Sequence, residues 1–172
     1  IITKGGDVAN IIPEETKMDF TIRALETANM LKLKEKLETC LKAAATATGC
    51  SVELEQEGPL VENMMGNEVM SDIFEEFAKK LGKIIFFKIR RSTNDASGSS
   101  TDAGNVSHVL PVIHPMFKLN TTAVNHTEEF TKVTNTEESL DITLTTAKAL
   151  ALTAIEVMRD PELMKKIKKQ FE

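Results

Sequence analysis

The sequence is poor in cysteine, since only Cys40 and Cys50 occur among its 172 residues. Two cysteines are too few for the disulfide scaffold of a small secreted protein, and their spacing is not that of a CxxC metal or redox motif. We therefore expect two free thiols and a protein that works in a reducing compartment, the cytoplasm.

Long apolar runs are also missing. No stretch approaches the roughly 20 residues that cross a bilayer, and the N-terminus lacks the charged start and apolar core of a signal peptide. The chain opens on Ile1 rather than on methionine, and its first three residues resemble the end of a strand that begins earlier. We therefore expect a soluble protein of which this chain is a fragment.

Positive charge is not in excess. The chain has 21 Lys and Arg residues against 26 Asp and Glu residues, which gives a formal net charge of −5. Nucleic acids and anionic membranes bind clustered cations, so we expect neither as a partner. With 41% hydrophobic residues, the composition is that of a globular protein with a core, and the length suits one domain or parts of two.

The first 58 residues predict a strand, a helix and a second strand. Residues 18–22 alternate apolar and polar side chains, which is the period of a half-buried strand. Apolar residues at helical spacing over 33–45 predict an amphipathic helix that ends at Gly49. Residues 52–54 alternate again, so these elements would form a small two-layer α+β sandwich.

Beyond Pro59 the pattern becomes α/β. Asn67 is expected to cap a helix that Gly82 ends. The runs 84–89 and 106–113 are almost continuously apolar, which is typical of central strands that are covered on both faces.

A polar loop of small residues, 92–105, separates these two predicted strands, and its backbone could offer hydrogen-bond donors to a ligand. Two more helices are predicted near the C-terminus. One begins at Thr136, and the last, which is basic, begins at Asp160 and Pro161.

The only three histidines, His108, His114 and His126, lie close together in the sequence. Three imidazoles could hold zinc, but their spacing matches no compact ligand motif. His108 lies in an apolar run, where a hydrogen-bonded core histidine is the simpler interpretation. His126 is the better ligand candidate, because it follows a polar loop and stands between Asn125 and Thr127, which could fix its tautomer.

Residues 98–105, Gly-Ser-Ser-Thr-Asp-Ala-Gly-Asn, form a second candidate site. The segment lacks the lysine of a phosphate loop and the flanking glycines of a nucleophile elbow. What remains is a tight turn whose amides could bind a carboxylate or an oxyanion, or a turn with a purely structural role. We expect Asp102 to hydrogen-bond to neighbouring backbone groups and Gly104 to allow close approach of a substrate.

Arg23 and Asn10 form a third candidate site. Arg23 offers a planar guanidinium on the open face of the first predicted strand, and a hairpin could bring Asn10 to the same surface. The pair could then bind a carboxylate and an amide. The alternative is that Arg23 is a solvated strand residue.

Several segments occur in an order that resembles a known family: residues 5–13, 22–24, 98–107, 114–115 and 125–128. Together they resemble the zinc aminoacylase and carboxypeptidase superfamily, in the aminoacylase-1-like branch that includes β-alanyl-lysine dipeptidase. The resemblance covers essentially the whole chain.

The resemblance implies an α/β catalytic domain that is interrupted by a ferredoxin-like α+β lid, with two zinc ions in the complete enzyme. Residues 1–58 would be the C-terminal half of the lid, through which subunits form a homodimer. Residues 59–172 would be the C-terminal segment of the catalytic domain. In the family, most metal ligands and the general base precede the part matched here, so this chain would hold no general base and would be inactive alone.

The resemblance also implies roles for single residues. His126 would be the last metal ligand. The residues that contact the substrate would be Asn10, Arg23, Ser100, Thr101, Asp102 and Gly104. The implied reaction is metal-dependent hydrolysis of an amide bond in dipeptides or N-acyl amino acids with a free carboxylate. The alternative is a non-catalytic homologue that serves self-association.

Overall fold

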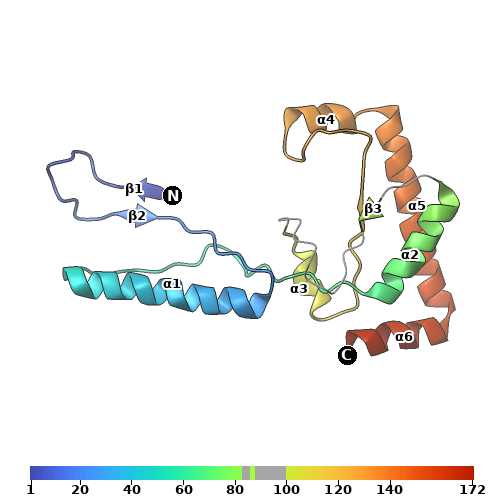
Figure 1. Ribbon diagram of the computed structural model, residues 1–172, viewed down its shortest axis with the longest axis horizontal. Helices are drawn as coiled ribbons and strands as arrows, with labels where there is room; N and C mark the ends of the chain where they lie inside the picture. Colours follow the sequence, from blue (N-terminus) through green and yellow to red (C-terminus); the bar gives the residue numbers. More distant parts are fainter. Residues whose placement is uncertain (83–85, 88–99) are drawn as a thin grey trace. The chain divides into compact units, whose positions relative to one another are not determined.

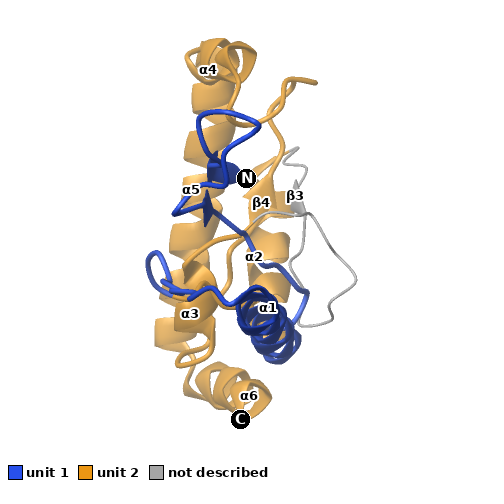
Figure 2. Ribbon diagram, turned by 90° about the vertical axis from the view of Figure 1, so that its left-hand side faces the viewer, with its two compact units in different colours: residues 1–59 blue, residues 60–172 orange. Residues whose placement is uncertain are grey.

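The computed structural model describes residues 1–82, 86–87 and 100–172, and the chain forms two compact units, residues 1–59 and 60–172 (Figures 1 and 2). Helices dominate, and two short antiparallel strand pairs accompany them, so the expected mixture of helix and strand is confirmed. The division lies beside the predicted boundary, while the assignment of the units to a lid and a catalytic segment stays a prediction. Within the described ranges, no helix is both long and apolar enough to span a membrane.

Unit 1 begins with a small β-hairpin. β1 (Ile2–Lys4) pairs antiparallel with β2 (Lys17–Met18). The α-amino group of Ile1 donates to the carbonyl oxygen of Asp19 at 2.8 Å, which extends the pairing by one residue. The strand predicted over 18–22 is therefore shorter than expected, because β1 offers backbone partners only this far.

α1 (Thr27–Thr48) follows the hairpin and ends where predicted, at Gly49. Gly49 has a φ of 71°, a left-handed conformation that glycine adopts without steric cost. The chain then returns along α1 (Figure 1), and Lys34 Nζ donates to Gln56 Oε1 at 2.7 Å. The predicted strand at 52–54 is wrong, since an alternating pattern makes a strand only where a second strand pairs with it.

Unit 1 has no buried residue: every side chain from residue 1 to 59 is exposed or half-buried. Cys40 and Cys50 are both exposed and free. This unit therefore has little hydrophobic core of its own, which limits how much apolar burial stabilises it.

Unit 2 is built on three helices, α2 (Glu68–Leu81), α5 (Glu137–Arg159) and α6 (Pro161–Phe171). α2 packs along α5, and α6 contacts both helices (Figure 1). Their core consists of Phe74, Ala78 and Ala149, with Phe77 and Ile113 packed against it. Full burial of a side chain such as Phe74 contributes about 1.5–3 kcal/mol of transfer free energy, so these contacts hold the helices together.

Side-chain caps begin all three helices where the sequence predicted them. Asn67 Oδ1 accepts from the backbone N–H three residues later at 3.1 Å, and Thr136 Oγ1 does the same at 3.2 Å. Asp160 Oδ1 accepts from two N–H groups of α6, at 2.9 and 3.1 Å, and proline occupies the first helical position. The predicted helix starts are confirmed because these signals are local.

The two strands predicted in unit 2 have different outcomes. Of the run 84–89, only β3 (Phe86–Phe87) is described, and it pairs antiparallel with β4 (Met116–Phe117). The run 106–113 is not a strand: α3 (Ala103–Ser107) takes up its beginning, and only Val112 pairs, in parallel with Gly66. An apolar run of this length does not distinguish a strand from a buried helical segment.

Candidate functional site

α3, which carries the end of the 98–105 turn, is attached to the backbone of the segment that leads into α2. Asn105 makes two of these bonds. Its Nδ2 donates to the carbonyl oxygen of Leu60 at 2.7 Å, and its Oδ1 accepts from the N–H of Glu62 at 3.2 Å. One amide side chain thus provides a hydrogen-bond partner for a carbonyl oxygen and for an N–H group of this backbone, two bonds that a neighbouring strand would otherwise supply.

Ser107 and His108 continue this attachment. Ser107 Oγ accepts from the N–H of Met65 at 2.8 Å and donates to the carbonyl oxygen of Gly104 at 2.6 Å. His108 Nε2 lies 3.0 Å from the carbonyl oxygen of Asn63. Because Ser107 is fully buried, its hydroxyl needs both partners. We call residues 104–108 with their bonds to residues 60–65 the α3 clamp.

Gly104 packs against the same segment. It is buried, and a Cβ atom at this position would overlap the carbonyl oxygen of Glu62. The close approach predicted at Gly104 therefore exists, but here the approaching group is the Glu62 backbone. A role of Gly104 in substrate binding stays a prediction, whereas its packing role follows from the geometry.

Ser100, Thr101 and Asp102 lie directly before α3, and residues 98 and 99 of this turn lie outside the described residues. Thr101 Oγ1 accepts from the N–H of Ala103 at 3.3 Å, whereas the Asp102 side chain makes no capping hydrogen bond. The carbonyl oxygen of Asp102 accepts from the N–H of Asn105 at 3.0 Å, so the expected hydrogen bond of Asp102 to a neighbouring backbone group is present, through its backbone and not as a side-chain cap of α3. Ser100 and Asp102 are exposed and open to a ligand.

His126 lies in the turn before α4 (Glu128–Thr134) and is exposed. Its φ of 69° is rare for a residue other than glycine and costs of order 1–3 kcal/mol. Thr127 holds the turn, because its Oγ1 donates to the carbonyl oxygen of Val124 at 2.7 Å and accepts from the N–H of Phe130 at 3.2 Å. The imidazole is thus presented to solvent, as expected, rather than buried in the core.

A metal site needs more than this one imidazole, since zinc takes about three or four protein ligands. In the part of the chain that the structure describes, no three His, Cys, Asp or Glu side chains are grouped to hold a metal ion. A zinc site formed by the three histidines is therefore not present there. His126 could supply one ligand, but the described residues do not form a complete site.

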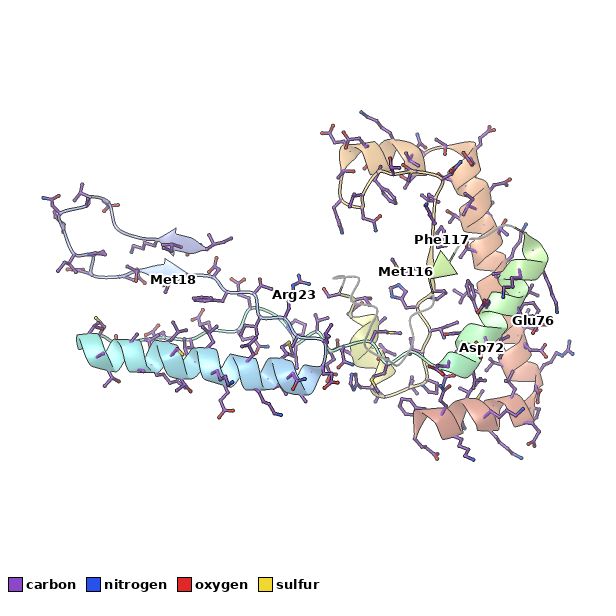
Figure 3. The ribbon with its side chains drawn as sticks, in the orientation of Figure 1. Met18, Arg23, Asp72, Glu76, Met116 and Phe117 are labelled. Atoms are coloured by element: carbon purple, nitrogen blue, oxygen red, sulfur yellow. The ribbon has the colours of Figure 1, made fainter. Side chains whose placement is uncertain are left out.

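Asn10 and Arg23 are both exposed, but the hairpin does not bring them together. Asn10 lies in the loop between β1 and β2, and Arg23 lies in the extended segment between β2 and α1. The loop projects from one end of β2, and Arg23 lies beyond the other end (Figure 3). Arg23 is not a strand residue as expected, because β2 ends at Met18. Whether either side chain contacts a substrate stays a prediction.

Glu15 carries the clearest electrostatic effect in unit 1. Its carboxylate lies 2.6 Å from Lys4 Nζ and 3.4 Å from Lys17 Nζ. The hydrogen bond from Lys4, followed by that from Lys17 and by the two positive charges, lowers the pKa of Glu15 below its ordinary value. Since these side chains are more than half exposed, the ion pairs mainly fix the base of the loop.

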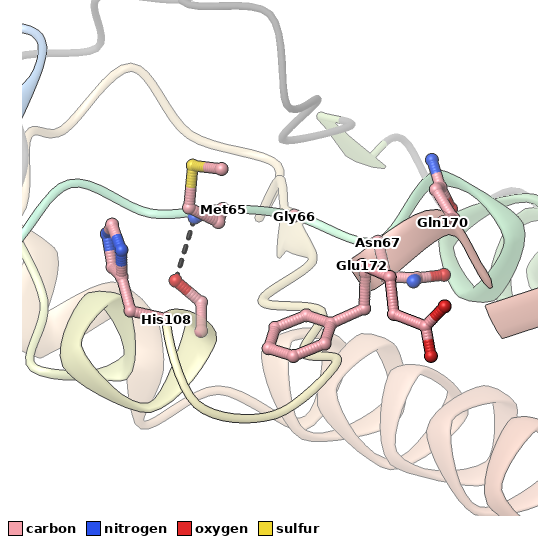
Figure 4. Close-up of a pocket in the computed structure, with 8 residues that line it drawn as sticks. Met65, Gly66, Asn67, His108, Gln170 and Glu172 are labelled. Atoms are coloured by element: carbon pink, nitrogen blue, oxygen red, sulfur yellow. Dashed lines mark hydrogen bonds between the residues drawn. The ribbon is translucent and has the colours of Figure 1, made fainter. Parts of the chain in front are cut away.

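A pocket of about 350 Å³ opens in unit 2 (Figure 4). It is lined by Met65, Gly66, Asn67, Ser107, His108, Gln170, Phe171 and Glu172. None of the predicted site residues lines it. Its buried polar side chains already serve the fold: Asn67 Nδ2 donates to the carbonyl oxygen of Ile167 at 3.0 Å, and Ser107 belongs to the α3 clamp. The pocket therefore adds no candidate site.

Sequence reasoning missed the side chains that anchor α3. Asn105 and Ser107 are polar residues on either side of Val106, at the start of an otherwise apolar run. Polar side chains that are carried into a buried environment must find hydrogen-bond partners, and this was the available signal. It does not say which backbone groups those partners would be.

Comparison with known proteins finds similarity to peptidases. Residues 2–48 match the peptidase dimerisation domain. The chain is 41% identical over 171 residues to the Xaa-Arg dipeptidase of Mus musculus and 40% identical to that of Homo sapiens. Each match covers 99% of this chain and 39% of the relative.

A more distant relative is the N-acetyldiaminopimelate deacetylase of Bacillus cytotoxicus, which is 30% identical over 76 residues, 44% of this chain and 20% of the relative. The chain thus spans 39% of the length of the dipeptidases that match it throughout. With an identity of 40% or more over nearly every residue, the chain belongs to the zinc aminoacylase and peptidase superfamily, whose C-terminal portion it resembles.

Proposed function

We propose that this chain is part of a metal-dependent hydrolase that cleaves the amide bond of dipeptides. The observation that carries the proposal is the 41% identity to an Xaa-Arg dipeptidase across 99% of the chain. Residues 1–58 would form half of a ferredoxin-like lid, and residues 59–172 would form part of the α/β catalytic domain. The protein would act in the cytoplasm.

We propose dipeptides with a basic C-terminal residue as substrates, ahead of N-acyl amino acids. The relatives named for Xaa-Arg dipeptides match 99% of the chain, whereas the deacetylase matches 44% of it. Such substrates carry a free carboxylate, a free ammonium and a second cationic group, a guanidinium in arginine or an ammonium in lysine, so the site must offer partners of both charges.

Two residues of unit 1 are proposed to contact the substrate. Arg23 would bind the substrate carboxylate through its planar guanidinium, which can donate two parallel hydrogen bonds. Asn10 would bind an amide group. Because the two residues lie at opposite ends of β2, we assign them separate contacts rather than one shared anion site.

In unit 2, the turn of Ser100, Thr101 and Asp102, in which Ser100 and Asp102 are exposed, would line the substrate site together with Gly104, and the α3 clamp would hold this turn in place. His126 would give one imidazole to zinc. Two bound ions would polarise the scissile carbonyl and lower the pKa of water. The other ligands and the general base would lie outside these 172 residues, so the chain alone would not hydrolyse peptides.

The test uses the longest polypeptide that the source encodes around this sequence. The parent protein should cleave Ala-Arg and Ala-Lys faster than Ala-Glu or N-acetyl-alanine. His126→Ala should remove about one of two zinc ions by elemental analysis and abolish turnover. His108→Gln is the matched control and should retain both ions. Equal zinc content and turnover in the parent and His126→Ala would refute the role of His126.

Arg23 is tested in the same protein. Arg23→Lys keeps the charge but loses the planar fork of the guanidinium. The decrease in kcat/KM should correspond to a loss of about 1–3 kcal/mol of transition-state stabilisation, while the free energy of unfolding stays unchanged. Arg159→Lys makes the same chemical change at an exposed position of α5 and should leave kcat/KM unchanged. Equal effects of the two variants would contradict substrate binding by Arg23.

Self-association is the second candidate function, because residues 2–48 match a peptidase dimerisation domain. We propose a homodimer formed through unit 1, in which lid residues act on the partner's site. Mixing subunits that carry Arg23→Ala with subunits that carry His126→Ala should restore part of the activity. A mixed dimer without activity would show that the lid residues do not act across the interface.

A further inference from the structure

α5 exposes large apolar side chains and buries small or hydroxylated ones. Its buried side chains are those of Ser139, Thr146, Ala149 and Thr153. Exposed fractions of 48–74% belong to the much larger side chains of Leu140, Leu144, Ile155 and Met158. A surface helix of a globular protein has the opposite distribution, with large apolar side chains in the core and polar ones in solvent. The exposed side of α5 therefore has the composition of a contact surface.

The exposed apolar residues form one continuous row along α5. Ala147 and Ala151 are also exposed and complete the row, in which neighbours are three or four residues apart. We call these six residues the α5 stripe: Leu140, Leu144, Ala147, Ala151, Ile155 and Met158. At 100° per residue they lie within about 80° of the helix circumference, and the row is about 27 Å long.

The α5 stripe carries no charge. The charged residues between its two ends, Asp141, Lys148 and Glu156, all lie on another side of the helix. Ala149, which packs in the core with Phe74 of α2, lies on the side opposite the stripe. Single exposed apolar residues are common, but a charge-free row of this length indicates a site of contact with another apolar surface.

The length of the relatives indicates what covers this surface. The match to the Xaa-Arg dipeptidases runs over 171 residues and therefore includes α5. It spans only 39% of each relative, so most of their polypeptide has no counterpart here. A protein of that length has enough further chain to cover the α5 stripe.

Two other occupants are less favoured by the sequence. A second copy of this chain already has a candidate contact surface elsewhere, because the match to a dimerisation domain covers residues 2–48 of unit 1. A helix that lies on an anionic membrane has a basic polar face. α5 instead has more acidic than basic residues: Glu137, Glu138, Asp141 and Glu156 against Lys148 and Arg159.

We infer that the α5 stripe is an internal contact of a longer polypeptide, covered by an apolar face of the part that lies outside these 172 residues. α5 would then be a buried helix with apolar contacts on two sides, α2 on one and the further part of the polypeptide on the other. The inference goes beyond the proposed function, because it holds whichever bond the protein hydrolyses.

The first test is thiol labelling of single cysteines on α5, with the exposed Cys40 and Cys50 replaced by serine. Leu144→Cys places a thiol in the stripe, and Asp141→Cys places one at an exposed position outside it, as the matched control. Each rate is divided by that of the same variant unfolded in urea. In the dilute 172-residue chain the two normalised rates should be similar. In the longest polypeptide that the source encodes, Leu144→Cys should react at least about tenfold more slowly than Asp141→Cys.

Four outcomes of the labelling would overturn the inference. The first is equal normalised rates in the longest encoded polypeptide, or a source that encodes no residue beyond these 172. The second is slow labelling of Leu144→Cys in the dilute 172-residue chain, since residues of this chain would then cover the stripe. The third is labelling of this chain that slows as its concentration rises, which assigns the stripe to a second copy. The fourth is labelling that slows only with phosphatidylserine vesicles, which assigns it to a membrane.

A charge placed in the stripe gives a second test. Leu144→Lys should leave the melting temperature of the 172-residue chain unchanged, because the side chain stays in solvent. It should lower that of the longest encoded polypeptide by several degrees, because a buried charge without a partner is costly. Asp141→Lys is the matched control and should change neither. Equal melting temperatures of the two variants in the longest polypeptide would overturn the inference. Neither test measures hydrolysis, so failure of the inference and failure of the proposed function are distinguishable.

Discussion

Replacing Gly104 by alanine perturbs the α3 clamp with a single methyl group. The added Cβ would overlap the carbonyl oxygen of Glu62, and neither the Cβ, which is fixed by the backbone at residue 104, nor this backbone oxygen can rotate away. α3 must therefore move off the segment 60–65. This displacement lengthens the bonds of Asn105 to Leu60 and Glu62, now 2.7 and 3.2 Å, and weakens the bonds of its neighbours in the clamp.

The expected cost follows from these contacts. Overpacking by one methyl group costs about 1–3 kcal/mol, and each weakened hydrogen bond adds up to about 1 kcal/mol. We expect the free energy of unfolding of unit 2 to fall by about 2–5 kcal/mol. At about 4 °C for each kcal/mol in a unit of this size, the melting temperature should fall by roughly 8–20 °C.

Urea and thermal unfolding of the chain, followed by circular dichroism, measure this loss. Asp102→Ala is the matched control: the residue precedes α3, is exposed and makes no capping hydrogen bond, so its removal should change stability by less than about 0.5 kcal/mol. If Gly104→Ala unfolds at the same urea concentration as Asp102→Ala, the packing argument fails.

Three further predictions concern caps and charge. Asn67→Ala removes the cap of α2 and the bond to Ile167, so urea unfolding should show a loss of about 2–3 kcal/mol; a loss under 0.5 kcal/mol would contradict the cap. Thr136→Ala should lower the free energy of unfolding, measured in urea, by about 1 kcal/mol, and Thr136→Ser should leave it almost unchanged; equal losses in the two variants would show that the hydroxyl does not cap α5. In the folded hairpin the pKa of Glu15 is lowered, so its ion pairs stabilise the hairpin above the unfolded-state pKa, and this stabilisation is lost as pH falls through the lower folded-state pKa. Carboxyl NMR should show the Glu15 midpoint rising in Lys4→Gln; an unchanged midpoint would refute this cause.

The helices were predictable because each start and end is encoded by a few neighbouring residues. Asn67, Thr136 and Asp160 accept from N–H groups two or three residues away, and Gly49 ends α1 by its own conformation. These interactions do not depend on the rest of the chain.

The strands were less predictable because pairing depends on distant residues. The alternation at 52–54 and the apolar run at 106–113 each specify a buried face, but not the partner that would cover it. In the second case, side chains of α3 took the place of a strand partner, through Asn105 and Ser107.

The candidate site was predictable in its residue types but not in its arrangement. The exposure of His126 followed from its polar neighbours. The separation of Asn10 from Arg23 depends on where β2 ends, and β1 decides that.

The cap of α2 is local, but two further hydrogen bonds at its start are made to residues that leave the ribosome much later. Asn67 donates to Ile167, 100 residues further along, and the N–H of Val69 donates to Gln170, 101 residues further along. During synthesis, these two groups of α2 therefore lack their partners until α6 has left the ribosome, whereas the core around Phe74 can already form with Ala149 of α5. A chain that stops before residue 161 would keep both groups unpaired, and proteolysis would reveal the weakened structure at the start of α2 rather than at the truncated end.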